Sequence, residues 1–334
     1  MGMKEVRSIL NDIKQGHVKP VYFLSGEEPF FIDTISKYIE DHLLQDHEKS
    51  FNQTVFYGRE TTVDDVMTAA KRYPMMADRQ VVIVKEAQHL WRTIEQFEPY
   101  VSNPQPSTVL VVCYKNRTLD KRRKLAKEVR SRGVLFEGKK VYENRIPDWI
   151  SQAVKARGFS ISIKGAHLMA EFLGSDLSMI DKELEKLAVI CKPGTEITPE
   201  VIEENIGISK DYNNFELLDA IGSRNAKKTF AIVGHFAENP GNYPLVLTLS
   251  LLHTFFTRIL KYHALSNKRD APRVLGINPF FVKDYQTAAA NYSMKQASAA
   301  IAVILETDRK SKGVGASAIP QEELLKELCA VLIR

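Results

Sequence analysis

The sequence predicts an α/β domain built on a parallel sheet, followed by a long all-α region. Two observations carry this prediction. Within the first 140 residues, short runs of β-branched residues alternate with segments of helical periodicity, which is typical of a parallel sheet wrapped by helices. From about Asn144 onward the strand signal largely stops, and amphipathic helices follow one another. We therefore expect residues 1–140 to form the α/β domain.

Each expected element of this domain has a local signal. Five short apolar runs predict the strands, at residues 21–24, 54–57, 81–84, 109–112 and 134–136. Apolar residues at helical spacing predict a helix over residues 30–43. A capping pattern at residues 62–65 opens the next helix, which should end before Pro74. A helix near residues 94–100 and a basic helix from Asp120 complete the alternation.

The all-α region is expected to contain two domains. Glycine breaks at Gly158, Gly174 and Gly207 separate short amphipathic helices, which indicates a small helical domain over residues 141–210. About five further amphipathic helices follow, and they indicate a second helical domain over residues 211–334. Within the first of these domains, one predicted helix carries an apolar stripe that should pack inward. The stripe consists of Leu177, Ile180, Leu184 and Leu187.

Composition excludes several classes of protein. The 46 Lys and Arg against 41 Asp and Glu give a net charge of +5, so any nucleic-acid contact should be local. Cys113, Cys191 and Cys329 are isolated, which supports neither a disulfide framework nor a zinc site and fits a reducing cytoplasm. The N-terminal segment lacks the apolar core of a secretion signal, and polar residues interrupt the most apolar stretch, residues 244–260. We expect a cytoplasmic protein without a membrane partner.

The first strand and helix lie where an ATPase would carry its phosphate-binding loop, but the chemistry of that loop is missing. Such a loop needs amide-rich glycines, a Lys for the phosphates and a Ser or Thr for magnesium. The connection here carries Glu27, Glu28 and Pro29 and no Lys, and the third strand ends in Lys85 and Glu86 instead of an acidic pair. The eight histidines are scattered. We expect no intrinsic catalysis, no cofactor and no metal.

The densest positive charge in the sequence is the basic run Lys121, Arg122, Arg123 and Lys124. One interpretation is a contact with a DNA backbone. The other is a solvated helix face that covers the sheet and is anchored by Leu125. No aromatic residue is interleaved there to stack on bases, so the sequence favours the second interpretation.

Eight short segments, in order, span nearly the whole chain and together carry a family resemblance. They are VYFLSGEE at 21–28, MMADRQVVIV at 75–84, LDKRRKL at 119–125, DLSMIDKELEKL at 176–187, ITPEV at 197–201, FELLDAI at 215–221, LGINP at 275–279 and TDRKSKG at 307–313. Each segment is weak alone, but their order and spacing make coincidence improbable. In this arrangement the chain resembles the delta-subunit family of the bacterial DNA polymerase III clamp loader.

The resemblance implies a fold, partners and a role. The fold would be a RecA-like AAA+ domain over residues 1–140, a helical lid over 141–210 and a helical collar over 211–334. The collar would assemble into a five-membered ring with the motor subunits (gamma/tau) and the delta-prime subunit. The motor subunits would hydrolyse ATP, while this chain binds the beta sliding clamp and helps to open it for loading onto primed DNA. It would belong to a DNA-directed DNA polymerase by complex membership only.

The resemblance also implies a clamp-binding site. In this family a pair of large apolar residues, just before a small-x-Arg-x segment and an apolar strand, plugs a hydrophobic pocket on the clamp. Here the pair is Met75 and Met76. The helix expected over residues 63–73 should end at Pro74, which would leave both methionines at an exposed tip. The alternative is that both pack into the domain core. Methionine departs from the commoner Leu-Phe type of pair, but its flexible thioether suits an adaptable contact.

Two other functional classes compete with this hypothesis. One is an active AAA+ ATPase, such as a clamp-loader motor subunit or a helicase loader, and the missing loop Lys and acidic pair argue against it. The other is a DNA-binding regulator that relies on the basic run, and it would leave the helical region after residue 211 unexplained.

Overall fold

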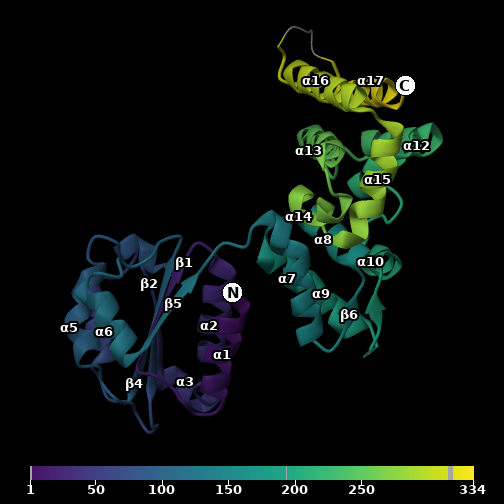
Figure 1. The fold of residues 1–334 in the computed structure, drawn as a ribbon. Helices are drawn as coiled ribbons and strands as arrows, with labels where there is room; N and C mark the ends of the chain where they lie inside the picture. Colours follow the sequence, from purple (N-terminus) through teal and green to yellow (C-terminus); the bar gives the residue numbers. More distant parts are fainter. Residues whose placement is uncertain (1, 193, 315–318) are drawn as a thin grey trace. The chain divides into compact units, whose positions relative to one another are not determined.

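The computed structural model describes residues 2–192, 194–314 and 319–334, and the chain divides into two compact units (Figure 1). The first unit is Met1–Tyr142 and the second is Glu143–Arg334. The division of the second unit into a lid over residues 141–210 and a collar over residues 211–334 stays a prediction.

The first unit is built on a five-stranded sheet. Its strands are β1 (Val21–Gly26), β2 (Gln53–Tyr57), β3 (Gln80–Lys85), β4 (Thr108–Lys115) and β5 (Val134–Gly138). They lie in the order β2-β3-β4-β1-β5, and all neighbouring pairs are parallel. The five predicted strands are therefore confirmed. Every residue of β1 is buried, as expected for a strand near the middle of a parallel sheet that is covered on both faces.

Helices cover both faces of this sheet. They are α1 (Gly2–Lys14), α2 (Pro29–His42), α3 (Asp46–Asn52), α4 (Val63–Ala70), α5 (Glu98–Ser102) and α6 (Lys124–Arg132), with 3-10 turns η1 (Ala87–Leu90) and η2 (Ile94–Phe97). Helices α1 and α2 lie on one side of the sheet, and α5 and α6 lie on the other (Figure 1). On the second side, apolar residues of α4, α5 and α6 form one core cluster with alternate residues of β1, β3 and β4.

Helix α4 ends at Ala70 and not at Tyr73, where the sequence predicted its end. Two side chains from neighbouring strands bind its last carbonyls. Thr108 Oγ1 donates to Ala70 O (2.8 Å), and Gln80 Nε2 donates to Ala69 O (3.3 Å). In a longer helix the Ala70 carbonyl would have no amide partner, because the residue four positions on is Pro74. The helix therefore ends there, with its last carbonyls bonded from the strands.

Helix α6 begins at Lys124, which corrects the expectation of a basic helix from Asp120. The Asp120 Oδ1 atom accepts a hydrogen bond from the Arg122 amide (3.0 Å). Such a local bond from an aspartate to the backbone stabilises a turn in competition with the helix. Most of the basic run therefore lies in the turn before α6.

Helix α3 lies in a segment for which the sequence analysis predicted no helix. Its start is a capping box in which the Gln45 amide donates to Glu48 Oε2 (2.8 Å). The helix has seven residues, too few for the recurring apolar stripe that identified the longer helices.

The second unit is almost entirely helical. Its helices are α7 (Ile146–Ala156), α8 (Ile163–Leu173), α9 (Leu177–Ile190), α10 (Pro199–Ile206), α11 (Asn214–Gly222), α12 (Ala226–Glu238), α13 (Leu245–Ala264), α14 (Ala271–Leu275), α15 (Val282–Asn291), α16 (Met294–Ser311) and α17 (Gln321–Ile333), with 3-10 turns η3 (Glu143–Arg145), η4 (Lys268–Asp270) and η5 (Pro279–Phe281). Two short strands, β6 (Ser160–Ile161) and β7 (Glu196–Ile197), pair in parallel. The predicted inward stripe of α9 is buried. Among the described residues, no helix has the combination of length and apolarity needed to cross a bilayer.

A half-buried glutamate joins α8 to α11 within this unit. Glu171 Oε1 accepts a hydrogen bond from the Asn214 amide at the start of α11 (2.8 Å). Burial raises the pKa of the Glu171 carboxyl to about 7. Nearby, the His167 ring of α8 packs edge-on against Phe281 at 4.8 Å between ring centroids. The helices on either side of residue 211 therefore share polar and aromatic contacts.

We expect this glutamate to make the stability of the protein depend on pH. An ordinary glutamate has a pKa of 4.5, whereas Glu171 in the folded chain has a pKa of about 7. Between these two pH values the folded state therefore binds more protons than the unfolded state. The free energy of unfolding should therefore fall as the pH rises through this window. Glutamine stays neutral at every pH, so the Glu171→Gln variant should lose less stability than the wild type as the pH rises from about 5 to about 8, a span that covers this window. The measurement is urea unfolding of the full chain at each pH.

Glu204→Gln provides the matched control, because Glu204 is exposed on the same unit. This variant should follow the wild-type dependence on pH. Parallel curves for Glu171→Gln and the wild type would contradict the assignment.

Candidate functional site

Two backbone amides of the loop after β1 are bonded within the protein itself. The Gly26 amide donates to a carbonyl after β4 (2.8 Å), and the Glu28 amide donates to a carbonyl at the end of β5 (3.1 Å). The Glu28 carboxylate accepts from the Phe30 amide at the start of α2 (3.3 Å), and Pro29 has no N–H to offer. Amides and a helix N-terminus that would bind phosphate in an ATPase are thus used internally.

Charged side chains at the same edge of the sheet are also paired within the unit. Lys85 at the end of β3 forms an ion pair with Glu40 of α2 (2.8 Å). Lys115 at the end of β4 pairs with Asp33 of the same helix (2.7 Å). Lys85 occupies the place where an ATPase would carry the acidic pair for magnesium. The arrangement offers no carboxylate pair for a metal at this strand end.

The two predicted site residues Met75 and Met76 lie in the turn between α4 and β3. Their side chains are 61% and 104% exposed. This exposure excludes the alternative that both pack into the domain core. The backbone of Met76 has a φ of +53°, a left-handed conformation that is uncommon for a residue with a side chain. Such outliers occur where neighbouring structure imposes them, and they gather at functional sites.

A buried asparagine, which the sequence analysis did not single out, binds this turn. Asn52 is the last residue of α3 and is 3% exposed. Its Oδ1 atom accepts from the Met75 amide (2.6 Å), and its Nδ2 atom donates to the Met75 carbonyl (2.9 Å). The capping pair Gln45 and Glu48 is the local signal that could have revealed α3 and so drawn attention to Asn52.

Further large apolar side chains are exposed beside the methionines in the chain. Tyr73 lies two residues before Met75 and is 78% exposed, and Phe51 precedes Asn52 and is 70% exposed. The bonds of Asn52 tie these two segments together. A local concentration of exposed apolar side chains on a soluble domain is typical of a protein-interaction surface.

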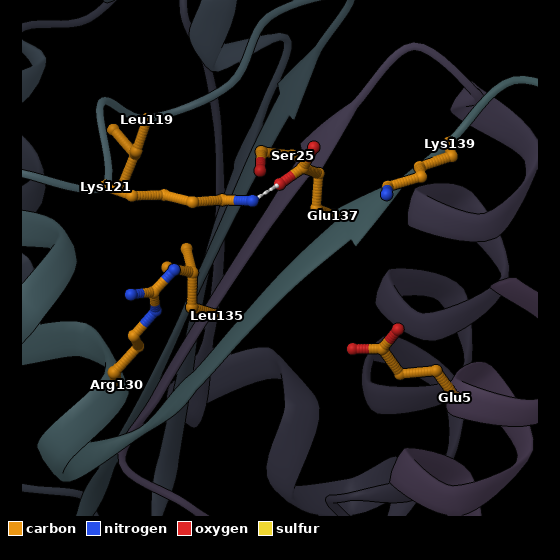
Figure 2. Close-up of a pocket in the computed structure, with 8 residues that line it drawn as sticks. All are labelled: Glu5, Ser25, Leu119, Lys121, Arg130, Leu135, Glu137 and Lys139. Carbon is orange, nitrogen blue, oxygen red and sulfur yellow. Dashed lines mark ion pairs between the residues drawn. The ribbon is translucent and has the colours of Figure 1, made fainter. Parts of the chain in front are cut away.

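The basic run, residues 121–124, spans the turn before α6 and the first residue of that helix. Each of its four cations has a carboxylate partner. The pairs are Lys121 with Glu137 (2.5 Å), Arg122 with Asp120 (3.0 Å), Arg123 with Glu95 (3.7 Å) and Lys124 with Glu98 (2.8 Å). Figure 2 shows the amine of Lys121 directed at Glu137 in a shallow pocket beside β5. This pairing reduces the local positive charge, and a DNA-backbone contact by the run stays a prediction.

The chain is similar to known proteins in both sequence and fold. Residues 22–139 match the family described as DNA polymerase III, delta subunit. The chain is 26% identical over 291 residues to the DNA polymerase III subunit delta of Bacillus subtilis, with 83% of each protein covered. It also resembles the solved structure of the Bacillus subtilis DNA clamp loader delta protein, at a TM-score of 0.58 and 24% identity, over 98% of this chain and 99% of that one. The structural likeness supports the fold, a parallel α/β unit followed by an almost entirely helical unit. In sequence and in fold, the chain is therefore similar to DNA polymerase III delta subunits.

Proposed function

We propose that this chain binds the beta sliding clamp through Met75 and Met76 and helps to open it for loading onto primed DNA. The observation that carries the proposal is the exposed, backbone-anchored methionine pair. It stands at the position where the delta family carries its apolar clamp contact. The similarity to delta subunits supports the choice of partner, and the exposure of the pair supports a surface on which that partner can act.

The methionine pair is large enough to anchor an interface. Transferring two such side chains from water into an apolar pocket contributes on the order of 3 to 5 kcal/mol. Interfaces commonly draw most of their affinity from a few buried side chains of this kind. The methionine side chain is unbranched and has three rotatable bonds. Met75 and Met76 can therefore adapt to a pocket whose shape differs from one that fits a Leu-Phe pair.

Opening of the clamp requires a difference in affinity. A ligand shifts an equilibrium only by the amount that it binds one state better than the other. The chain must therefore bind the open or distorted clamp more tightly than the closed ring. In this proposal the methionine pair contributes most of the affinity for the clamp. The shape of the surrounding surface makes the affinity for the open clamp higher than that for the closed ring.

The helices after residue 211 would hold the chain in the loader. Large apolar side chains are exposed on them, among them Val246, Leu247, Leu305 and Val331. These residues suit contacts with the motor subunits (gamma/tau) and the delta-prime subunit in a ring, and primed DNA would be met through the assembled loader. The proposed role implies a cytoplasmic location and no membrane partner. It needs no cofactor and no catalysis by this chain. The alternative of an ATP-hydrolysing motor or helicase loader is not favoured by any observation on the loop after β1.

The double variant Met75→Ala, Met76→Ala should lose at least about tenfold in affinity for the beta clamp, or roughly 1.4 kcal/mol. Its thermal melt should match the wild type, because both side chains lie in solvent and not in the core. The measurement is clamp binding by surface plasmon resonance, alongside a circular-dichroism melt.

The matched control is Met179→Ala, Met294→Ala, which removes two exposed methionines from the second unit. This variant should bind the clamp as the wild type does. Undiminished clamp binding by the Met75 and Met76 variant, or collapse of its fold, would mean that the contact lies elsewhere.

The full chain should also fail to bind ATP, since the amides and the helix N-terminus after β1 are already occupied. A titration with fluorescently labelled ATP and magnesium should give no saturable signal in the micromolar range. Saturable binding that unlabelled ATP displaces, and that Glu28→Ala alters, would refute this expectation.

A further inference from the structure

We propose that Asn52 is a positioning residue for the clamp contact, which holds the methionine turn in its binding conformation before the clamp arrives. This inference rests on the proposed function. The feature that carries it is a two-point bond between one buried side chain and the backbone of Met75.

The geometry of the bond suits an amide side chain in particular. Asn52 accepts from the Met75 N–H at 2.6 Å and donates to the Met75 C=O at 2.9 Å. The side chain therefore binds Met75 as a neighbouring strand would bind it. Among short side chains, asparagine offers a donor and an acceptor side by side in one plane. Its Nδ2 atom also lies 3.2 Å from the Glu48 carbonyl, which orients the amide from within α3.

The other end of the turn is held independently. Gln80, the first residue of β3, donates through Nε2 to Thr108 Oγ1 (2.8 Å) and to the Ala69 carbonyl (3.3 Å). The chain between α4 and β3 is thus fixed where it leaves the helix, at Met75 and where it enters the strand. This explains how Met76 keeps its left-handed backbone although that conformation costs free energy.

A preformed turn matters for affinity. A free loop loses conformational entropy when it binds, and the apparent affinity falls in proportion to the fraction of molecules that hold the competent shape. Asn52 does not need to touch the clamp to have this effect. It needs only to keep Met75 in place, so that Met76 and its neighbour project together.

The test uses the full chain with Asn52→Ala and Asn52→Asp. Alanine removes both bonds, so clamp affinity should fall about fivefold, and the Met75 amide should exchange faster with deuterium in NMR spectra. Aspartate keeps the acceptor for the Met75 amide and loses the donor. This variant should keep the amide slow and retain affinity between those of the wild type and alanine.

Ser25→Ala is the matched control. Ser25 is buried in β1 and donates to the Phe136 carbonyl of β5 (3.0 Å), toward the opposite side of the sheet from β2. Its loss removes one buried bond from the same unit without touching the turn. A melt shifted by Ser25→Ala, with unchanged clamp affinity, would separate a general loss of stability from the effect of Asn52.

The outcomes separate this inference from the function on which it rests. Faster exchange at Met75 in Asn52→Ala with full clamp affinity would overturn the positioning role, while the Met75 and Met76 double variant still tests the contact itself. If the double variant also binds normally, the proposed function fails. Unchanged exchange at Met75 in Asn52→Ala would show that other bonds hold the turn, and would overturn the inference directly.

Discussion

Burial of the parallel sheet on both faces is the constraint on which the first unit depends. Because helices cover each face, the central strands β1, β3 and β4 are buried along most of their length, and polar groups that could act on a ligand gather in the connections at the strand ends. At the carboxyl ends, the Gly26 and Glu28 amides donate to carbonyls after β4 and at the end of β5, and the Glu28 carboxylate accepts from the Phe30 amide of α2. These bonds occupy donors that a phosphate would otherwise use, which illustrates that function belongs to sites and not to folds.

The sequence predicted the elements whose signals are local. The five strands follow from short apolar runs, and the start of α4 follows from the capping of Asp65 by Thr62. The predicted helix ends are wrong where other hydrogen bonds, from elsewhere in the chain or from a local turn, determine where the helix begins or ends. The last carbonyls of α4 are bonded by Gln80 and by Thr108, which lies 38 residues from Ala70 along the chain, and the start of α6 depends on a turn at Asp120.

Some features of the candidate site could likewise be predicted from the sequence, and others could not. The position of Met75 and Met76 came from a resemblance in the sequence, but their exposure is a property of the folded chain. The bonds from Asn52 to Met75 span 23 residues, so no periodicity or motif around either residue could have indicated them. The ion pairs that compensate the basic run are equally non-local, with Lys121 bound to Glu137 and Lys124 to Glu98.

The methionine turn precedes β3, whereas the loop that would hold nucleotide follows β1. All strands run in the same direction, so the two connections lie at opposite ends of the sheet, about 20 Å apart for a strand of this length. Substitutions that reshape the turn between α4 and β3 thus need not disturb the loop after β1. During evolution, this separation would let the turn change in sequence without altering the bonds that hold the loop after β1. It also makes the turn a suitable place for grafting a recognition sequence onto this scaffold.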